Sequence, residues 1–463
     1  MIEFENVSFS YEANPDQNSI SDLSLMIEDG ECVLLTGSSG CGKSTILRLL
    51  NGLIPEFYDG KRSGSIRIDG EEISGKGIYD LAGKIGTVFQ NPRSQFFNVD
   101  TTCEIAFGPE NLALPEEEIL TRIRETATAF QIENLLDRDI FGLSGGEKQK
   151  IACASVDVLK APLILLDEPS ANLDYESAER LRLMIGVWKK EGKTVIIAEH
   201  RINYIWDFID RAIIIEKGRI VCDIKGEEKK NFGREMQSKY RIRSTERISP
   251  VTLAESISLP YADDDIILSN FQYAYKKNQV VNIPELRIPK GKATAIVGSN
   301  GAGKTTFLQC VCGILKNKGV LTLDGKSYKC RERRGKIFMV MQDPNHQLFT
   351  ESVLDEVLIS MPEENEQQAR EIIRQVDLLE YADRHPMSLS GGQKQRTAIA
   401  CAVASECPIL LFDEPTSGLD MTRMLQVAEI IKQIKAAGRT LIIVTHDSEF
   451  IENCCDNVIV LKR

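Results

Sequence analysis

The chain has 463 residues, of which 42% are hydrophobic and 27% are charged, as in ordinary globular proteins, and this length allows roughly two to four domains. Its net charge of −12 provides no overall positive field, which argues against a protein that binds DNA over a wide surface. No apolar run approaches the roughly 20 residues that span a bilayer, and the acidic start is unlike a signal peptide, so we expect a cytoplasmic location.

The first informative element is a strand followed by a glycine-rich loop and a helix. The apolar run ECVLLT precedes GSSGCGKST at residues 37–45, and the helical pattern ILRLLNGL follows. In this context G-x-x-x-x-G-K-[ST] binds nucleotide phosphates, because backbone N–H groups turn inward and the helix N-terminus adds positive charge. We predict that Lys43 neutralises the β- and γ-phosphates and that Ser44 is a Mg²⁺ ligand.

The next unusual stretch is the loop VFQNPRSQFFNVDT at residues 88–101. Gln90 ends an apolar strand, and the Asn-Pro step that follows prevents a helix. Phe96 and Phe97 then predict an apolar surface for a partner helix. Packing inside the domain's own core is an equally good interpretation for either ring.

The motif LSGGEKQK, which begins at Leu143, predicts a capped helix start. Ser144 and Glu147 fit the S-x-x-E capping box, while Gly145 and Gly146 expose the N–H groups of the first turn. Alone, this motif could be a plain capped helix. Beside a phosphate-binding loop, it predicts a clamp on a γ-phosphate, supplied from the opposite domain.

The strand LILLDEP is a continuous apolar run, typical of a parallel strand buried on both faces. Asp167 then lies at the carboxyl end of the sheet and can orient Mg²⁺, and Glu168 is predicted to be the general base for the attacking water. The strand TVIIAEH ends at His200, which we expect to contact the γ-phosphate or to position Glu168 and water. Plain capping or structural roles are the alternatives.

The chain then repeats itself. The charged segment 226–264 has no sustained apolar period and predicts a solvated linker between domains at residues 1–225 and 265–463. The second domain contains VGSNGAGKTT, VMQDPNHQLFTES, LSGGQKQR, ILLFDEPTSGLD and TLIIVTHD in the same order, which indicates two homologous domains. Its matching residues are Lys304, Thr305, Gln342, Leu348, Phe349, Ser390, Gln393, Asp413, Glu414 and His446.

With these motifs in this order, the sequence resembles the ATP-binding-cassette (ABC) ATPases over nearly its whole length outside the linker. The resemblance implies an α/β fold of the P-loop NTPase type, with two tandem cassettes. Each cassette would have a mixed β core, a small antiparallel β subdomain and a helical subdomain. The two cassettes would form a head-to-tail dimer within the chain, with ATP and Mg²⁺ held between the phosphate loop of one and the LSGG motif of the other.

The resemblance also implies a role for each matching residue. Glu168, Glu414, His200 and His446 would be catalytic, and Asp174 and Asp420 would communicate between the cassettes. Mg²⁺ would contact Ser44, Gln90, Asp167, Thr305, Gln342 and Asp413, and adenine would stack on Tyr11 and Tyr275. The remaining ATP contacts would come from Gly37, Ser38, Ser39, Gly40, Cys41, Gly42, Lys43, Ser44, Thr45, Ser144, Gly145, Gly146, Gly298, Ser299, Asn300, Gly301, Ala302, Gly303, Lys304, Thr305, Thr306, Ser390, Gly391 and Gly392.

Both copies keep the lysine, the Asp-Glu pair and the histidine, which predicts two competent hydrolytic sites. The main departure between them is Glu147, where the second copy has Gln393. We expect this difference to change one site slightly without inactivating it.

Within this family, the loop Gln-Asn/Asp-Pro-x-x-Gln-[Leu/Phe]-Phe and the sequence AEHR are similar to the ATPases of energy-coupling-factor importers. By this resemblance the chain would power import of a vitamin or a transition-metal ion from the cytoplasmic face of the membrane. It would dock on a transmembrane coupling protein that carries a separate membrane substrate-binding component, and it would bind no nucleic acid. The alternatives are a soluble tandem-cassette ATPase on the ribosome, which usually has a longer basic linker, and a tandem sugar-importer ATPase, which usually has one degenerate site.

Overall fold

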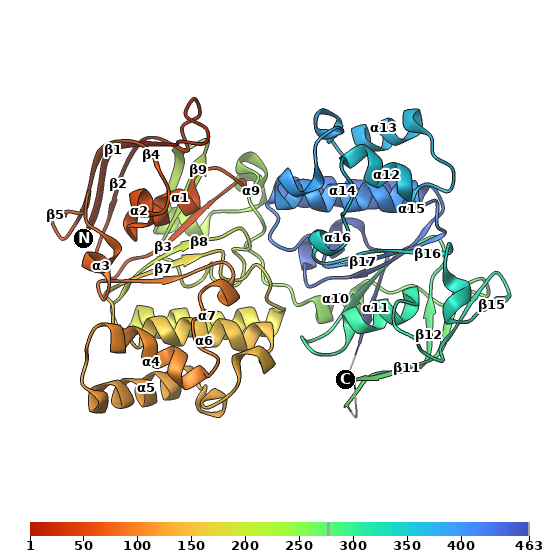
Figure 1. The fold of residues 1–463 in the computed structure, drawn as a ribbon, viewed down its shortest axis with the longest axis horizontal. Helices are drawn as coiled ribbons and strands as arrows, with labels where there is room; N and C mark the ends of the chain where they lie inside the picture. Colours follow the sequence, from red (N-terminus) through yellow and green to blue (C-terminus); the bar gives the residue numbers. More distant parts are fainter. Residues whose placement is uncertain (276–277, 462–463) are drawn as a thin grey trace. The chain divides into compact units, whose positions relative to one another are not determined.

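The computed structural model describes residues 1–275 and 278–461, so the last two residues of the predicted second domain lie outside the described part. The chain divides into two compact units, Met1–Arg247 and Ile248–Arg463 (Figure 1). In the described part, no helix has the length and apolar character needed to cross a membrane.

The first unit contains two sheets. The smaller one is antiparallel, with strand order β2–β1–β4–β5, and the larger one has the order β10–β9–β3–β8–β7–β6. All neighbours in the larger sheet are parallel except β10, which pairs antiparallel with β9 at the edge. The strands are β1 (Ile2–Tyr11), β2 (Ile20–Ile27), β3 (Cys32–Gly37), β4 (Gly60–Ile68), β5 (Glu71–Glu72), β6 (Ile85–Val88), β7 (Leu163–Asp167), β8 (Thr194–Ala198), β9 (Arg211–Glu216) and β10 (Arg219–Lys225).

Helices cover both faces of the larger sheet, because its strands are apolar on both faces. In β7, Ile164 and Leu166 join the core that contains residues of α5, α6 and α7, while Leu163 and Leu165 join the core that contains α1 and the antiparallel sheet. The helices are α1 (Lys43–Leu50), α2 (Leu53–Glu56), α3 (Ile78–Leu81), α4 (Thr101–Asn111), α5 (Glu116–Phe130), α6 (Gly145–Asp157), α7 (Tyr175–Lys190), α8 (Glu227–Lys230) and α9 (Arg234–Tyr240).

The second unit repeats this plan. Its antiparallel sheet has the order β12–β11–β14–β15, and its larger sheet, β16–β17–β18–β13–β19, is parallel throughout the described strands. The strands are β11 (Ile266–Tyr275), β12 (Asn278–Ile288), β13 (Ala293–Val297), β14 (Val320–Leu323), β15 (Lys326–Tyr328), β16 (Ile337–Val340), β17 (Ile409–Asp413), β18 (Thr440–Val444) and β19 (Asn457–Val460). The helices are α10 (Pro250–Ser256), α11 (Lys304–Cys312), α12 (Val353–Ser360), α13 (Glu366–Gln375), α14 (Gly391–Ala404), α15 (Met421–Ala436) and α16 (Ser448–Cys454).

The segment 226–264 differs from the solvated linker that the sequence predicts. Its first half forms α8 and α9 on the first unit, where Phe232 packs against Trp206 with ring centroids 5.1 Å apart. Its second half forms α10, whose Leu253 is buried in a cluster of the second unit. A few scattered apolar side chains hold these short helices, and such contacts leave no sustained periodic pattern in the sequence.

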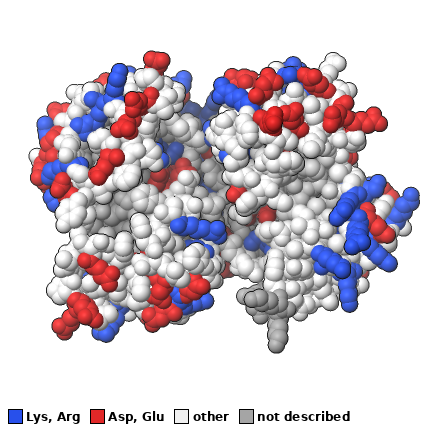
Figure 2. Space-filling model, viewed as in Figure 1, with Lys and Arg blue, Asp and Glu red and all other residues white. Residues whose placement is uncertain are grey.

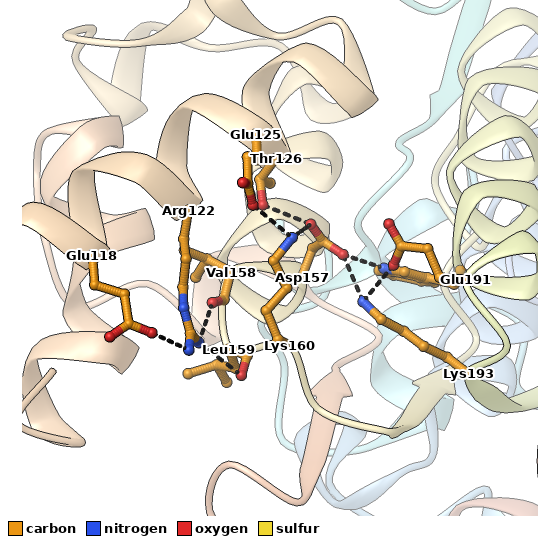
Figure 3. Close-up of polar contacts among 11 residues, drawn as sticks. Glu118, Arg122, Glu125, Thr126, Asp157, Val158, Leu159, Lys160, Glu191 and Lys193 are labelled. Atoms are coloured by element: carbon orange, nitrogen blue, oxygen red, sulfur yellow. Dashed lines mark hydrogen bonds and ion pairs between the residues drawn. The ribbon is translucent and has the colours of Figure 1, made fainter.

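A buried acidic residue ties the helical layer of the first unit to its larger sheet (Figure 3). Asp157, at the end of α6, accepts hydrogen bonds from Thr126 of α5 (2.6 Å) and from the indole N–H of Trp188 in α7 (2.9 Å). Its carboxylate also pairs with Lys193 at 2.8 Å, just before β8. Burial alone would raise the pKa of Asp157, but Lys193 and the hydrogen bonds outweigh burial, so this pKa lies below its usual value.

The second unit holds a buried arginine at the C-terminal end of α11. Arg333 belongs to a 3₁₀ turn, Cys330–Arg333, and is fully buried. Its guanidinium donates to the carbonyls of Cys310 (2.7 Å) and Val311 (3.3 Å) and lies 4.7 Å from the ring centroid of Phe271. A cation at this place satisfies carbonyls that have no partner within the helix.

Candidate active sites

The phosphate loop of the first unit connects β3 to α1. Gly42 has φ +111°, and a Cβ at this position would lie 2.6 Å from the carbonyl oxygen of Ser19, so both the backbone and the space require glycine. Lys43 is buried at the first position of α1, and its Nζ donates to the carbonyls of Gly37 and Ser38, each at 3.2 Å. The loop therefore places a buried cation at a helix N-terminus, which is an anion-binding arrangement.

The predicted catalytic groups of the first unit meet beside this lysine. His200 Nε2 lies 3.3 Å from Lys43 Nζ and 3.2 Å from Glu168 Oε1. Gln90 donates from Nε2 to Glu168 Oε2 at 2.6 Å. A lysine, a carboxylate and an imidazole from three separate elements therefore lie together. Polarisation of a water molecule next to a phosphate requires such a group of side chains.

The second unit brings the matching residues together around Lys304. Lys304 Nζ donates to the carbonyls of Gly298 (2.8 Å) and Ser299 (2.9 Å), and His446 Nε2 lies 3.3 Å from Glu414 Oε1. Gln342, however, is exposed, and no hydrogen bond of its side chain occurs within the described ranges. The two loops therefore differ in whether their glutamine contacts the predicted general base.

Both predicted general bases have an unusual backbone conformation. Glu168 has φ +43° and Glu414 has φ +49°, in the left-handed region that non-glycine residues rarely adopt. In each case the backbone N–H donates at 2.8 Å to a neighbouring strand, Glu168 to Ala198 and Glu414 to Val444. Such strain, held in place by the sheet, is typical of functional positions.

The carboxylates predicted to bind Mg²⁺ have the environment that a cation needs. Ser44 Oγ donates to Asp167 Oδ1 at 2.8 Å, so the two predicted ligands lie together. Burial raises the pKa of both Asp167 and Asp413, and the hydroxyl of Thr305 opposes this for Asp413. Asp413 Oδ1 is buried and has no hydrogen-bond partner among the described residues. These hydroxyl and carboxylate oxygens therefore fit Mg²⁺.

The two LSGG motifs are helix starts, as their capping boxes predict. Ser144 caps α6 together with Glu147, whose carboxylate accepts the backbone N–H of Ser144 at 2.8 Å. Ser390 caps α14 in the same way, and Gln393 Oε1 accepts the backbone N–H of Ser390 at 2.8 Å. The substitution of glutamate by glutamine between the copies therefore leaves this geometry unchanged.

The predicted adenine-stacking tyrosines differ in their surroundings. The hydroxyl of Tyr11 lies 3.1 Å from Thr45 Oγ1 and accepts a hydrogen bond from Arg48 at 3.1 Å, which places its ring beside the first phosphate loop. Tyr275 is 48% exposed and contacts Tyr273 edge-on. Stacking on adenine remains a prediction for both.

Asp174 and Asp420 cap the helices that follow the two Asp-Glu pairs. Asp174 accepts from the backbone N–H of Ser177, and Asp420 from that of Arg423, each at 2.8 Å. Capping accounts for an aspartate at these positions. Their proposed role in communication between cassettes stays a prediction.

Within the repeated glutamine loop, the four predicted apolar contacts separate into two classes. Phe96 and Leu348 pack into the cores of their units, whereas Phe97 is 77% and Phe349 is 75% exposed. The core interpretation therefore holds for the first apolar residue of each loop, Phe96 and Leu348, and not for the second.

The sequence interpretation missed two carboxylates that shape these loops. Glu104 is buried and accepts the backbone N–H groups of Phe97 (2.9 Å) and Asn98 (2.7 Å). Glu356 does the same for Phe349 and Thr350. The internal repeat could have indicated both residues. Glu104 and Glu356 occupy equivalent positions, since they are as far apart in the chain as Gln90 and Gln342.

A third missed carboxylate is Glu199, which is buried beside His200. It accepts the backbone N–H groups of Ser170 (3.2 Å) and His200 (2.7 Å) and the hydroxyl of Tyr204 (3.2 Å). Burial raises the pKa of Glu199. The second copy has threonine here, so the repeat comparison gave no signal for it.

Known proteins are similar to this chain in both sequence and fold. The model of the ABC transporter family matches residues 20–171 and 281–417, one segment in each unit. A "Putative ABC transporter ATP-binding protein" of Treponema denticola is 42% identical over 100% of this chain and 95% of its own length. The chain belongs to the ABC transporter ATP-binding proteins. Each unit of this ABC protein is a cassette, and the chain is an ATPase.

Two further proteins are similar to this ABC ATPase. The "Putative HMP/thiamine import ATP-binding protein YkoD" of Bacillus subtilis is 32% identical over 100% of the chain and 90% of its own length. A solved model of ribosome-bound archaeal Pelota and ABCE1 contains a chain with a TM-score of 0.70 and 22% identity, covering 98% of this chain and 76% of that one. At this identity the second likeness concerns the tandem-cassette fold alone.

Proposed function

We propose that this ABC ATPase powers an energy-coupling-factor-type importer of a small molecule, of the vitamin or transition-metal ion class. It acts at the cytoplasmic face of the membrane, on a transmembrane coupling protein that carries a separate substrate-binding component. The similarity to an import protein named for HMP and thiamine supports this class. The observation that carries the proposal is the form of the two glutamine loops.

Both loops present an exposed aromatic ring, and the first loop also joins it to a contact with the predicted general base. In the first cassette Gln90 contacts Glu168, and Phe97 stands exposed a few residues later, stacked on Phe107 with centroids 5.0 Å apart. The buried Glu104 fixes the backbone on which Phe97 is presented. An exposed ring on a rigid loop is characteristic of a docking contact rather than of a mobile surface side chain.

A cavity beside this loop supports the same interpretation. It has a volume of about 310 Å³, and its lining includes Phe89 of the loop and the apolar side chains of Ile78, Leu81 and Leu112. Tyr79, at its edge, is 83% exposed. A concave apolar site of this size fits the side chains of a partner helix.

In the proposed mechanism, ATP closes the two cassettes and hydrolysis lets them separate. Mg²⁺, when bound, neutralises charge on the β- and γ-phosphates, and Ser44 and Asp167 would hold it. Glu168 takes the proton of the attacking water at a carboxylate oxygen, while His200 fixes the orientation of that carboxylate. Gln90, which is hydrogen-bonded to Glu168, transmits a movement of this carboxylate to the docking loop, residues 88–101.

The test is a double variant, Phe97→Asp/Phe349→Asp, made in the full chain. We expect basal ATPase activity to persist and co-purification with integral membrane proteins from detergent-solubilised membranes to be lost, because a charge replaces each docking ring. Tyr261→Asp, at an exposed tyrosine outside the loops, is the matched control and should keep both. Loss of ATPase activity with intact assembly would contradict the docking role.

The alternative of a soluble tandem ABC ATPase on the ribosome shares the tandem fold and predicts a different fractionation. A membrane-bound pool that is released by a detergent-free carbonate wash favours the importer. Co-sedimentation with ribosomes favours the alternative.

A further inference from the structure

The second cassette carries a concentrated basic surface around β15. Its members are seven exposed lysines and arginines: Lys316, Lys318, Lys326, Lys329, Arg331, Arg334 and Lys336. Figure 2 shows Lys and Arg side chains gathered over β15, at the right of the view. In a chain with a net charge of −12, this basic surface is a local exception.

The basic surface is not neutralised from within. In the part of the chain that the structure describes, none of its seven cations forms an ion pair. The two acidic residues in the same stretch are engaged elsewhere, because Asp324 pairs with Lys290 and Glu332 accepts the backbone N–H of Lys329 at 2.7 Å. The positive charge therefore faces solvent.

The corresponding part of the first cassette shows that the fold does not require such a surface. There Lys76 and Lys84 both pair with Glu71, and Arg67 pairs with Glu5 at 3.2 Å. Exposed pairs of this kind contribute little to stability. The difference between the cassettes is therefore one of surface chemistry, not of folding.

An exposed apolar residue accompanies the cations. Ile314 is 52% exposed in the loop that also contains Lys316 and Lys318. A cluster of lysines and arginines next to an exposed apolar side chain is typical of surfaces that bind anionic lipid headgroups. The one aromatic residue of the stretch, Tyr328, packs against the core of its unit, so the surface offers no ring on which nucleic-acid bases could stack.

We propose that this basic surface binds the anionic lipid headgroups of the membrane that contains the transport partner. The inference rests on the proposed function, which puts the docking loops and the bilayer on the same side of the second cassette. The turn Ile78–Leu81 precedes β6 and Gln90, and the turn Cys330–Arg333 precedes β16 and Gln342, with the same number of residues between turn and glutamine. Arg331 of the second cassette therefore corresponds to Tyr79 of the first, beside the docking loop. Because the chain as a whole is acidic, an anionic bilayer repels its other faces and attracts this one.

The experiment measures co-sedimentation of the full chain with phosphatidylcholine vesicles, with and without phosphatidylserine. We expect binding to the anionic vesicles alone, and weaker binding as salt rises. The variant Lys326→Glu/Lys329→Glu should reduce partitioning onto these vesicles by at least about tenfold. It should keep wild-type ATPase activity, because neither residue contacts a phosphate loop.

The matched control is Lys61→Glu/Arg62→Glu, which changes the net charge equally at exposed residues of the first cassette. Its vesicle binding should stay at the wild-type level. Equal binding to neutral vesicles, or an equal loss in the control, would overturn the proposal. Binding of a double-stranded RNA probe where anionic vesicles fail to bind would instead assign the surface to RNA. Since the vesicles contain no protein, a negative result leaves the separate docking test intact.

Discussion

At the scale of single residues, the two predicted general bases are the clearest candidates for a catalytic role. Glu168 and Glu414 share a left-handed backbone, a fixed N–H hydrogen bond and a nearby histidine. A carboxylate held in this way has little freedom to turn from the water it must polarise, which supports a catalytic role in both cassettes.

We therefore expect both sites to hydrolyse ATP. Glu168→Gln and Glu414→Gln keep side-chain size and hydrogen bonding but remove the base, so each should slow turnover at its own site by about 100-fold or more. Steady-state ATPase activity should fall clearly in each single variant and be nearly absent in the double variant, with nucleotide binding retained. If either single variant kept wild-type activity, that site would not be a hydrolytic one.

A second residue-scale expectation concerns nucleotide affinity. Lys43→Ala and Lys304→Ala each remove a buried cation from one phosphate loop, so each should weaken nucleotide binding at its own site. Titration with a fluorescent ATP analogue should then show one tight site in place of two. Arg62→Ala, at an exposed β4 residue, should leave both sites unchanged.

At the scale of elements, the sequence predicted the helices, strands and loops whose structure depends on residues close together in the chain. The phosphate loops, the capped LSGG helices and the buried strands each lie within about a dozen residues, and the structure confirms the capping boxes and the strands. The short helices in 226–264 depend on contacts with distant elements such as Trp206, so no local pattern indicated them, whereas the loop-shaping Glu104 lies near its partners and was indicated only by its repetition as Glu356. The separation of Phe96 from Phe97 likewise needed the packed core.

The Asp157 network makes a prediction about one element junction. Asp157→Asn removes the closer of the two carboxylates that pair with Lys193 and leaves Glu191 at 3.0 Å, so the free energy of unfolding of the first cassette should fall by about 2 kcal/mol. Because the pKa of Asp157 is lowered in the folded state, its contribution is complete at neutral pH and is lost as pH falls through that lowered value. Urea unfolding should therefore show a gap between wild type and variant that narrows below about pH 4.

The control for this prediction replaces both partners. Asp157→Asn/Lys193→Met removes the charge pair together, keeps an amide oxygen that can accept from Thr126 or Trp188, and should cost less than Asp157→Asn alone. A single-variant cost no larger than that of the double variant would mean that the pair contributes no net stability.

At the scale of the whole molecule, each buried apolar cluster of the described residues lies wholly within one unit. Because each unit has its own set of apolar clusters, we predict two unfolding transitions in calorimetry of the full chain without nucleotide. Asp157→Asn should lower only one of them, by about 2–4 °C for each kcal/mol lost. A single transition that shifts as a whole would show that the cassettes unfold cooperatively.

Arg333 gives the second cassette a mechanical property that the first one lacks. Arg333 lies in the same turn as Arg331, beside the docking loop. Its guanidinium donates hydrogen bonds to carbonyls in the last turn of α11. The nine residues of α11 form a rod about 13 Å long whose other end is Lys304 of the phosphate loop. Leu81 occupies the matching position of the first cassette, and its side chain cannot donate such hydrogen bonds. A displacement of the turn in the second cassette would therefore be transmitted along α11 to the phosphate loop.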